Sequence, residues 1–454
     1  MNIIIIGCGK LGKKLMESLI AEGHNITIVD ENPQLVNTAV STYDVQGIEG
    51  NGASYQILQE AGVDSADLLI AVTNSDELNL LCCMIAKKAG NCPTIARVRN
   101  PVYREEIDFI KESMGLDMII NPEYESAAEM SRVLRRKSVI DINPFSKGRM
   151  ELMSFRITRD NILDGMPIYN IQMKLKCDVL ITAVERDNGV TIPSGGFVLR
   201  QGDVVSMLAA PSKANEFFRK IGMETRGAKT CLIIGGGTHA FYLAQFLLSY
   251  GMNVKIVEKK ASRCDELSIL LPKAVIINAD GTDQNLLMEE GLQYTDAFVS
   301  LTNVDEENIL LSLYAAQNTN TKIVTKVNRI NFNSVINSLE LGTVIYPQNI
   351  TADTILRYVR ARNNSRNKDN VETLYHIIGN QAEALEFNVN ESSFIINTPL
   401  VDLRIKPNTL VGCISRGGRV FLPRGKDSIQ VGDSVVIVTT IKGVSRLQDF
   451  FTKA

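Results

Sequence analysis

The chain has 454 residues, of which 45% are hydrophobic, and at about 100–200 residues per domain this length predicts two to four domains with their own cores. Its 48 Lys and Arg residues against 51 Asp and Glu residues give a net charge of −3, which argues against a dedicated nucleic-acid binder. No apolar run approaches the roughly 20 residues that cross a bilayer, and no signal-peptide pattern is visible, so we expect a cytoplasmic protein.

The N-terminal part alternates short β-branched runs with helical patterns. An apolar run at 2–6 precedes a helical pattern at 11–21, in which Leu11, Leu15 and Leu19 recur at helical spacing. Further strands are expected at residues 25–29, 45–48, 68–72, 95–98 and 118–120. This alternation predicts a parallel sheet with helices on both faces, as in doubly wound Rossmann-like domains.

The pattern then changes to one with few helical signals. A helix with a basic end is expected at 123–137, and its charges are interpreted as a solvated face rather than a docking site. Strand patterns follow at residues 153–157, 179–184, 190–192 and 204–208. We expect these strands to form a small β-rich domain of the α+β class.

The second half of the chain repeats the first. Gly7-Cys8-Gly9-Lys10-Leu11-Gly12 is matched by Gly235-Gly236-Gly237-Thr238-His239-Ala240, and the strand patterns return at residues 384–389, 410–414, 419–422 and 435–438. A period of half the chain length indicates duplicated domains. We therefore expect an α/β fold with two Rossmann-like domains, each followed by a small α+β domain. The expected domains are 1–122, 139–224, 228–348 and 369–454, with hinge helices at 123–138 and 349–368.

Each glycine loop lies between a predicted strand and a predicted helix, as a dinucleotide-binding G-x-G-x-x-G motif requires. The glycines permit a tight turn and a close approach to a pyrophosphate, and the helix N-terminus offers unpaired N–H groups. The predicted contacts are Gly7, Cys8, Gly9, Lys10, Leu11 and Gly12 in the first copy and Gly235, Gly236, Gly237, Thr238 and His239 in the second. Because Thr238 replaces Lys10, we expect the second site to be less cationic and to differ in ligand or affinity.

An acidic residue ends the second strand of each copy, Asp30 in the first and Glu258 in the second. Its distance from the loop is close to the roughly 20 residues expected for a carboxylate that binds ribose. Such a carboxylate accepts hydrogen bonds from the ribose hydroxyls and repels a 2′-phosphate, so NADP is disfavoured while NAD and ATP or ADP stay open. A turn or cap role is the alternative for either acid.

Other polar residues follow the remaining strands of each copy. They are expected to bind ribose or phosphate (Thr73, Asn74, Thr302, Asn303), to line the adenine edge (Asn51, Asp280) and to reach a phosphate from across the crevice (Arg97, Lys326). The pairs Asp76/Asn79 and Asp305/Asn308 are either further contacts or helix caps, and the sequence leaves both interpretations open.

A duplicated NAD-dependent oxidoreductase is the main alternative function. Such an enzyme needs an acid or base beside the nicotinamide, usually a His. His24, His239 and His376 fall in a turn, a glycine loop and a connecting strand, and none has a counterpart in the other copy. We therefore predict no catalytic residue and no enzyme. The eight cysteines lack metal-site spacing, so no metal ligand is predicted either.

The motifs IIIIGCGKLG (3–12), IVD (28–30), EGNGAS (49–54), AVTNSD (71–76) and IARV (95–98) resemble those of the TrkA family. This family comprises cytosolic regulatory subunits of bacterial and archaeal potassium transporters, built from tandem RCK N-terminal and TrkA-C domains. The resemblance covers nearly the whole chain. Three residues depart from the family pattern: Thr238, Ala240 and Asn51. At the position of Asn51, members of the family usually have Asp.

The resemblance implies a nucleotide-binding regulatory subunit that gates a membrane potassium uptake transporter and performs no chemistry. It implies NAD(H) and ATP or ADP as ligands, a ring of several chains, and an integral membrane potassium-translocating subunit of Trk type as partner, at the cytoplasmic face of the plasma membrane. In some relatives the TrkA-C domains bind a second small ligand, for which Arg200, Arg416 and Arg419 are candidate contacts, although the favoured interpretation of these arginines is a solvated surface. A free-standing nucleotide sensor is the third alternative.

Overall fold

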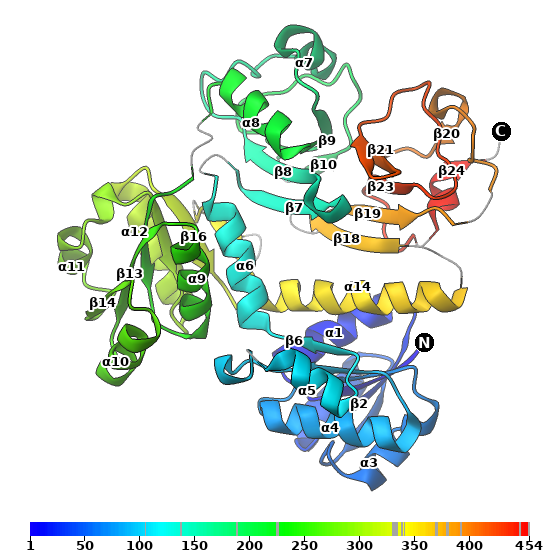
Figure 1. The fold of residues 1–454 in the computed structure, drawn as a ribbon, viewed down its shortest axis with the longest axis vertical. Helices are drawn as coiled ribbons and strands as arrows, with labels where there is room; N and C mark the ends of the chain where they lie inside the picture. Colours follow the sequence, from blue (N-terminus) through cyan, green and yellow to red (C-terminus); the bar gives the residue numbers. More distant parts are fainter. Residues whose placement is uncertain are drawn as a thin grey trace. The chain divides into compact units, whose positions relative to one another are not determined.

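The computed structural model describes residues 1–104, 106–136, 139–187, 189–223, 227–328, 335–336, 339, 341–367, 371–377, 381–390, 393–444 and 446–452. Two compact units emerge from its internal contacts, one comprising 1–130 and 231–356 and the other 131–230 and 357–454. Figure 1 shows the elements of both. Within the described residues, no helix combines the length and apolarity needed to cross a membrane.

The first unit contains two six-stranded parallel sheets with the same strand order (Figure 1). The order is β3-β2-β1-β4-β5-β6 in the first sheet and β14-β13-β12-β15-β16-β17 in the second. The first sheet consists of β1 (Asn2–Ile6), β2 (Asn25–Asp30), β3 (Gln46–Glu49), β4 (Leu68–Ala71), β5 (Thr94–Arg97) and β6 (Met118–Ile120). The second consists of β12 (Thr230–Ile234), β13 (Asn253–Glu258), β14 (Val275–Asn278), β15 (Ala297–Ser300), β16 (Lys322–Lys326) and β17 (Thr343–Ile345).

Helices follow the strands of both sheets. Around the first they are α1 (Lys10–Ala21), α2 (Pro33–Thr42), α3 (Tyr55–Glu60), α4 (Asp76–Gly90) and α5 (Ile107–Met114). Around the second they are α9 (Thr238–Ser249), α10 (Ala261–Leu270), α11 (Gln284–Glu289) and α12 (Asp305–Asn318). The central strand β1 is buried on both faces, since Ile3, Ile4, Ile5 and Ile6 are all at most 2% exposed. Continuous burial explains why this strand is uniformly apolar instead of alternating.

The second unit contains two five-stranded antiparallel sheets. The first has the order β10-β9-β11-β8-β7 and the second β18-β19-β23-β21-β22. Their strands are β7 (Asp141–Phe145), β8 (Met150–Arg156), β9 (Leu180–Arg186), β10 (Gly189–Thr191) and β11 (Val204–Ala209), and then β18 (Val371–Ile377), β19 (Ala382–Asn388), β21 (Thr409–Arg416), β22 (Arg419–Phe421) and β23 (Ser434–Thr439). A short pair, β20 (Arg404–Ile405) and β24 (Phe451–Thr452), completes the second module.

The first of these C-terminal modules also has helices that the sequence patterns did not predict, α7 (Ile168–Leu175) and α8 (Pro211–Lys220). On α8, Phe217 and Phe218 are fully buried and pack edge-on against Phe155 of β8. The sequence patterns predicted no strand at β7 and did not give the bounds of β18. The predicted fold class is nevertheless confirmed.

The two C-terminal modules share one apolar core. Leu152 and Leu208 of the first module pack in the same cluster as Ala384, Cys413 and Val436 of the second. Two long helices connect the units in sequence, α6 (Pro122–Leu134) and α14 (Pro347–Asn367), and the division between the units falls inside each helix. These are the two helices expected as hinges.

Candidate nucleotide-binding crevices

The first glycine loop is a tight turn between β1 and α1. Gly7 has a positive φ of 102°, and a Cβ there would lie 3.0 Å from the backbone nitrogen of Thr73, so the turn after β4 abuts the loop. A Cβ on Gly12 would lie 1.9 Å from the Gly7 carbonyl oxygen, whereas one on Gly9 would meet nothing within 4 Å. The space over Gly9 is therefore the open side of the loop.

The second loop repeats this geometry between β12 and α9. Gly235 has a φ of 97°, and a Cβ at this position would come within 2.9 Å of the Leu301 carbonyl oxygen. Gly237, like Gly9, faces open space, and Ala240 is fully buried where the first copy has its third glycine. Gly9 and Gly237 are the N-cap residues of α1 and α9 and supply no side-chain cap. The first N–H groups of both helices are thus available to an anion.

Each of the two predicted ribose-binding carboxylates is hydrogen-bonded to the glycine loop of the same domain. Asp30 accepts hydrogen bonds from the backbone N–H of Cys8 at 2.6 Å and of Asn32 at 2.9 Å. Glu258 accepts from Gly236 N–H at 2.7 Å and from Lys260 N–H at 2.8 Å. Each carboxylate therefore lies at the glycine loop with its charge stabilised by backbone donors, and its remaining lone pairs can accept further hydrogen bonds.

The residues after the third strand of each sheet differ between the copies. Asn51 accepts a hydrogen bond from Ala53 N–H at 2.8 Å and holds its own turn. Asp280 accepts from Thr282 N–H at 3.0 Å and from Lys259 Nζ at 2.7 Å, and these bonds, that of Lys259 most strongly, lower the pKa of Asp280 to about 2. The adenine role expected for both residues stays a prediction.

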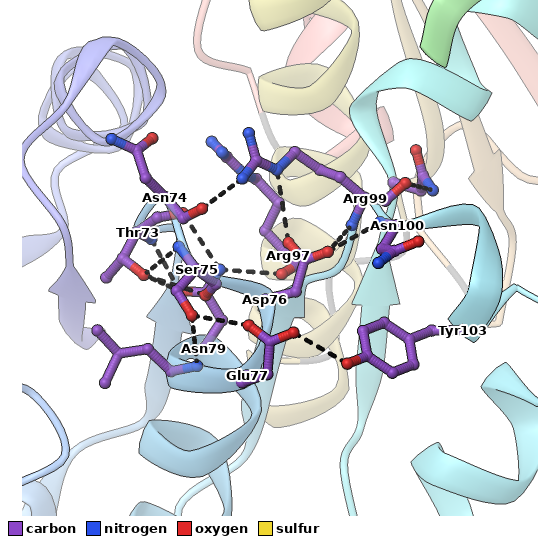
Figure 2. Close-up of polar contacts among 12 residues, drawn as sticks. Thr73, Asn74, Ser75, Asp76, Glu77, Asn79, Arg97, Arg99, Asn100 and Tyr103 are labelled. Atoms are coloured by element: carbon purple, nitrogen blue, oxygen red, sulfur yellow. Dashed lines mark hydrogen bonds and ion pairs between the residues drawn. The ribbon is translucent and has the colours of Figure 1, made fainter. Parts of the chain in front are cut away.

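The turn after β4 is fixed by Asn79, as Figure 2 shows. Its Oδ1 accepts from Thr73 N–H at 2.8 Å and from the Thr73 hydroxyl at 2.7 Å, and its Nδ2 donates to the carbonyl of Arg97 at 2.9 Å. Asn308 makes the equivalent bonds to Thr302 N–H and the Lys326 carbonyl. The Thr73 hydroxyl already donates its proton to Asn79. The neighbouring Asn74 is exposed, so its side chain is the better placed of the two to contact a ligand.

Asp76 is also a structural residue instead of a cap. Its carboxylate accepts from the backbone N–H groups of Arg99 and Asn100, both at 2.8 Å (Figure 2). The cap of α4 is Ser75, whose hydroxyl accepts from Leu78 N–H. In the second copy, Asp305 accepts from the N–H of Asn328 at 2.9 Å. The cap interpretation of Asp76 and Asn79 is therefore wrong, and the interpretation as further ligand contacts stays a prediction.

Arg97 and Lys326, at the ends of β5 and β16, are buried cations. Arg97 is 9% exposed and its Nε has no hydrogen-bond partner among the residues that the structure describes. Burial, together with the nearby charge of Arg99, lowers its pKa. Lys326 is 3% exposed, its Nζ lies 3.4 Å from the Leu301 carbonyl oxygen, and burial lowers its pKa to about 8. The carboxylate of Glu123 acts on both cations and offsets part of the cost of burying them. Because burial still disfavours their charged forms, an incoming anion would stabilise both.

Other predicted contacts divide between backbone and side chain. The side chains of Cys8 and Leu11 are buried in the core, so only their backbone can face a ligand, whereas Lys10 is exposed. The Nε2 atom of His239 is buried and has no hydrogen-bond partner within the described part of the chain. Burial, and to a smaller extent the charge of Lys326, lowers the pKa of His239 to about 3, which keeps the imidazole neutral near pH 7. His239 therefore adds no positive charge to the second glycine loop near pH 7.

Sequence patterns missed three residues near the ends of the sheets. Arg99, two residues beyond Arg97, donates to the Asn74 carbonyl and contacts Asp76 (Figure 2). Glu123, at the start of α6, interacts electrostatically with both Arg97 and Lys326, and burial raises its pKa. The hydroxyl of Tyr242, on α9 in the second copy, accepts a hydrogen bond from the side chain of Asn121 in the first copy. The extra cation next to Arg97 was the one visible signal for this region.

In the C-terminal modules, Arg416 is paired with a carboxylate. Its guanidinium forms two hydrogen bonds to the buried Asp433, at 2.8 and 2.7 Å. Arg186 binds Asp203 in the same way in the first module, with both distances at 2.8 Å. These paired bonds fix the turns between strands, and the contacts expected for a second ligand at Arg200, Arg416 and Arg419 stay predictions.

Comparison with known proteins gives the same organisation. The model of the TrkA-N domain matches residues 3–122 and 231–347, and that of the TrkA-C domain matches 152–222 and 384–452. The Trk system potassium uptake protein TrkA of Haemophilus influenzae is 31% identical, with 99% of this chain and 98% of that protein covered. The TrkA homolog 1 of Methanosarcina mazei is 30% identical, with 99% and 100% covered.

Solved structures share the fold at low sequence identity. The GsuK channel superposes with a TM-score of 0.65 at 16% identity, covering 97% of this chain and 77% of that one. The GsuK channel bound to NAD gives 0.63 at 16% identity over 97% and 77%. Two Rossmann-like domains with glycine loops, each followed by an antiparallel module, thus define a tandem RCK-type protein.

The chain belongs to the TrkA family. The proteins of this family are regulatory and not enzymatic, in agreement with the expectation for this chain.

Proposed function

We propose that this chain is the regulatory subunit of a Trk-type potassium uptake system, and that both crevices bind adenine nucleotides. The family and the relatives named for potassium uptake support the first part. Support for the second part comes from GsuK structures described as bound to NAD and to ADP. The nucleotide would be NAD(H) in one state and ATP or ADP in another.

One observation carries the ligand proposal. Each copy has a helix N-terminus without a side-chain cap and a buried cation at the end of its fifth strand, Arg97 in the first copy and Lys326 in the second. A pyrophosphate would bind the free N–H groups and neutralise the cation. Asp30 and Glu258 would then exchange part of their backbone bonding for ribose hydroxyls, with Asn51 and Asp280 at the adenine.

The regulatory output follows from differential binding. A nucleotide changes the behaviour of a partner only if it binds two conformations of the subunit with different affinity. The helices α6 and α14 run from the nucleotide-binding unit into the C-terminal unit, so they are the proposed hinges between segments 1–122, 139–224, 228–348 and 369–454. The proposed assembly is a ring of several chains on the cytoplasmic face of the membrane, beneath the potassium-translocating subunit.

Two measurements test this proposal. Isothermal calorimetry of the full chain with NADH, ATP and ADP should give saturable binding, which Asp30→Ala combined with Glu258→Ala should abolish. A pulldown with a Trk-type membrane subunit should recover the chain, with a yield that differs between ATP and NADH. No heat with any of the three nucleotides would refute the ligand proposal, and a yield independent of nucleotide would refute the regulatory one.

A further inference from the structure

The two C-terminal modules differ at the segment that forms helix α8 in the first of them. The two phenylalanines of α8 pack against Phe155 of β8. In the second module the corresponding ring contact joins Phe450 to Phe387 of β19, with their centroids 5.8 Å apart. Phe450 lies in a single 3₁₀ turn (Leu447–Phe450), and the described residues between 441 and 446 are not helical. The second module therefore has an irregular segment where the first has a helix.

Gly443 explains why this segment does not continue as a helix. Its φ of 73° is in the left-handed region, which interrupts a right-handed helix and which a glycine adopts without strain. The next residue, Val444, is β-branched, and its side chain packs against the apolar core of the second module. Helix α8, by contrast, has Pro211 at its start, a position that favours helix initiation.

A cavity of about 660 Å³ opens beside the irregular segment, which is a typical size for a small-molecule site. It lies at the short pair of strands β20 and β24 (Figure 1), where the N–H of Lys406 donates to the Phe450 carbonyl at 2.9 Å. The lining combines apolar and polar side chains. They are Phe394, Val444 and Phe451 on the one hand and Lys406, Gln448 and Asp449 on the other.

The polar part of the lining has one acid and one base. The carboxylate of Asp449 is paired with Arg446, whose Nε donates to it at 2.9 Å. The carboxylate closest to Lys406 in sequence, that of Asp402, belongs to an exposed residue four positions earlier. Within the described part of the chain, Lys406 forms no ion pair and the side-chain amide of Gln448 has no hydrogen-bond partner. The ammonium group and the amide are therefore both available to a ligand.

We propose that this cavity binds a small organic anion with a flat apolar body, such as an aromatic carboxylate. Lys406 donates a charge-assisted hydrogen bond to the carboxylate, and Gln448 supplies a second donor. The rings of Phe394 and Phe451 pack against the apolar body. A ligand held in this way joins the loop at Phe394 to the irregular segment, so it stabilises the second module by mass action. The proposal does not depend on nucleotide binding.

The test titrates the full chain with 2-naphthoate and follows binding by saturation-transfer difference NMR. The parent chain should bind this probe saturably. The uncharged 2-naphthamide, which has the same rings, should bind about tenfold more weakly, the scale of one charge-assisted hydrogen bond. Acetate, which has the charge without the rings, should also bind at least about tenfold more weakly. Absence of saturable 2-naphthoate binding would overturn the proposal, whatever the chain does with nucleotides.

Substitutions in the lining locate the binding. Lys406→Met should weaken 2-naphthoate binding about tenfold and remove the preference over 2-naphthamide. Lys406→Gln, a second neutral variant that stays polar, should give the same loss, whereas Lys406→Arg should retain the preference. Phe394→Ala should weaken both probes alike, by about fivefold. Unchanged 2-naphthoate affinity in Lys406→Met and Phe394→Ala would place the binding elsewhere and overturn the proposal.

The first module supplies a matched control. The N–H of Tyr169 and the N–H of Val401 donate to glycine carbonyls at corresponding turns, and Lys174 and Lys406 each follow five residues later. Lys174 is exposed on α7. Lys174→Met should therefore leave the affinity for both probes within about twofold of the parent. A loss as large as that of Lys406→Met would show that a general change in surface charge, and not the cavity, determines binding, which would also overturn the proposal.

Discussion

The side-chain amide of Asn121 donates a 3.2 Å hydrogen bond to the hydroxyl of Tyr242, a residue from the other half of the chain. The same Asn121 caps the start of α6 by accepting from Tyr124 N–H at 2.9 Å. The rings of Tyr124 and Tyr242 meet edge to face, with their centroids 5.4 Å apart. The corner between β6 and α6 is therefore part of the joint between the two nucleotide-binding domains.

Replacing Tyr242 by Phe should destabilise this joint without changing its packing. The hydroxyl is lost and Asn121 keeps its bond to the Arg99 carbonyl, so we expect a cost of about 0.5–1.5 kcal/mol. Urea denaturation followed by circular dichroism measures the loss. Tyr294→Phe is the control, because Tyr294 is 87% exposed. Equal unfolding midpoints for the two variants would contradict the prediction.

Asn79→Ala should be more damaging, because it removes the link between the turn after β4 and the end of β5. The buried Arg97 carbonyl loses its donor and Thr73 N–H loses its acceptor, at about 1–3 kcal/mol for each unsatisfied group. Asn308→Ala should cost a similar amount in the second domain. The exposed Asn74→Ala serves as the comparison, and a midpoint as low as that of Asn79→Ala would show that the network is not the cause.

Lys326 should make stability and ligand binding depend on pH above 8. Burial lowers its pKa from 10.5 to about 8, so between these values the unfolded chain binds the proton and the folded chain does not. Stability should therefore rise as the pH increases from 8 towards 10.5, by about 1.4 kcal/mol per unit of pKa difference, relative to Lys326→Met. Nucleotide affinity in the second crevice should fall over the same interval, because the neutral amine no longer attracts phosphate.

These two trends have opposite signs, which makes the experiment decisive. Denaturant unfolding and calorimetry at pH 7.5, 8.5 and 9.5 measure both in the same samples. If Lys326→Met keeps the parent's pH profile in both measurements, then Lys326 does not titrate in this range and the interpretation of its burial is wrong.

Gly412→Val should separate the two C-terminal modules. A Cβ at Gly412 would lie 2.5 Å from Cδ1 of Leu208 in the other module, so the side chain would wedge the shared core apart. Overpacking of this kind costs about 1–3 kcal/mol. Leu208→Ala in the same chain should restore part of the stability by making room, whereas it destabilises the parent. Gly196→Ala, where a Cβ meets nothing within 4 Å, should leave the melting temperature unchanged.

Much of the fold was predictable because it depends on patterns of residues that are close together in the sequence. Uniformly apolar strands such as β1, and the glycines of the two loops, predicted the parallel sheets and the duplicated organisation. Helix α8 was missed because its apolar residues, Ala214, Phe217 and Phe218, are few and only its packing against the module gives them a partner.

The site was predictable in part, for a similar reason. The glycine loops and the two acids are recognised by spacing along the chain, and the structure brings each acid to its own loop. The roles of Asn79 and Asp76 depend on contacts with β5 and the turn after it, about 20 residues away in sequence. Arg99 and Glu123 gain their importance from neighbours on other strands, which no local pattern reveals.

The shared core of the C-terminal modules has a consequence for stoichiometry. Two separate polypeptides that met through such a surface would part on dilution and exchange with other copies. Here the partners are covalently joined, so their pairing is independent of protein concentration. Each half can also acquire substitutions that the other lacks, a freedom that no assembly of identical chains has.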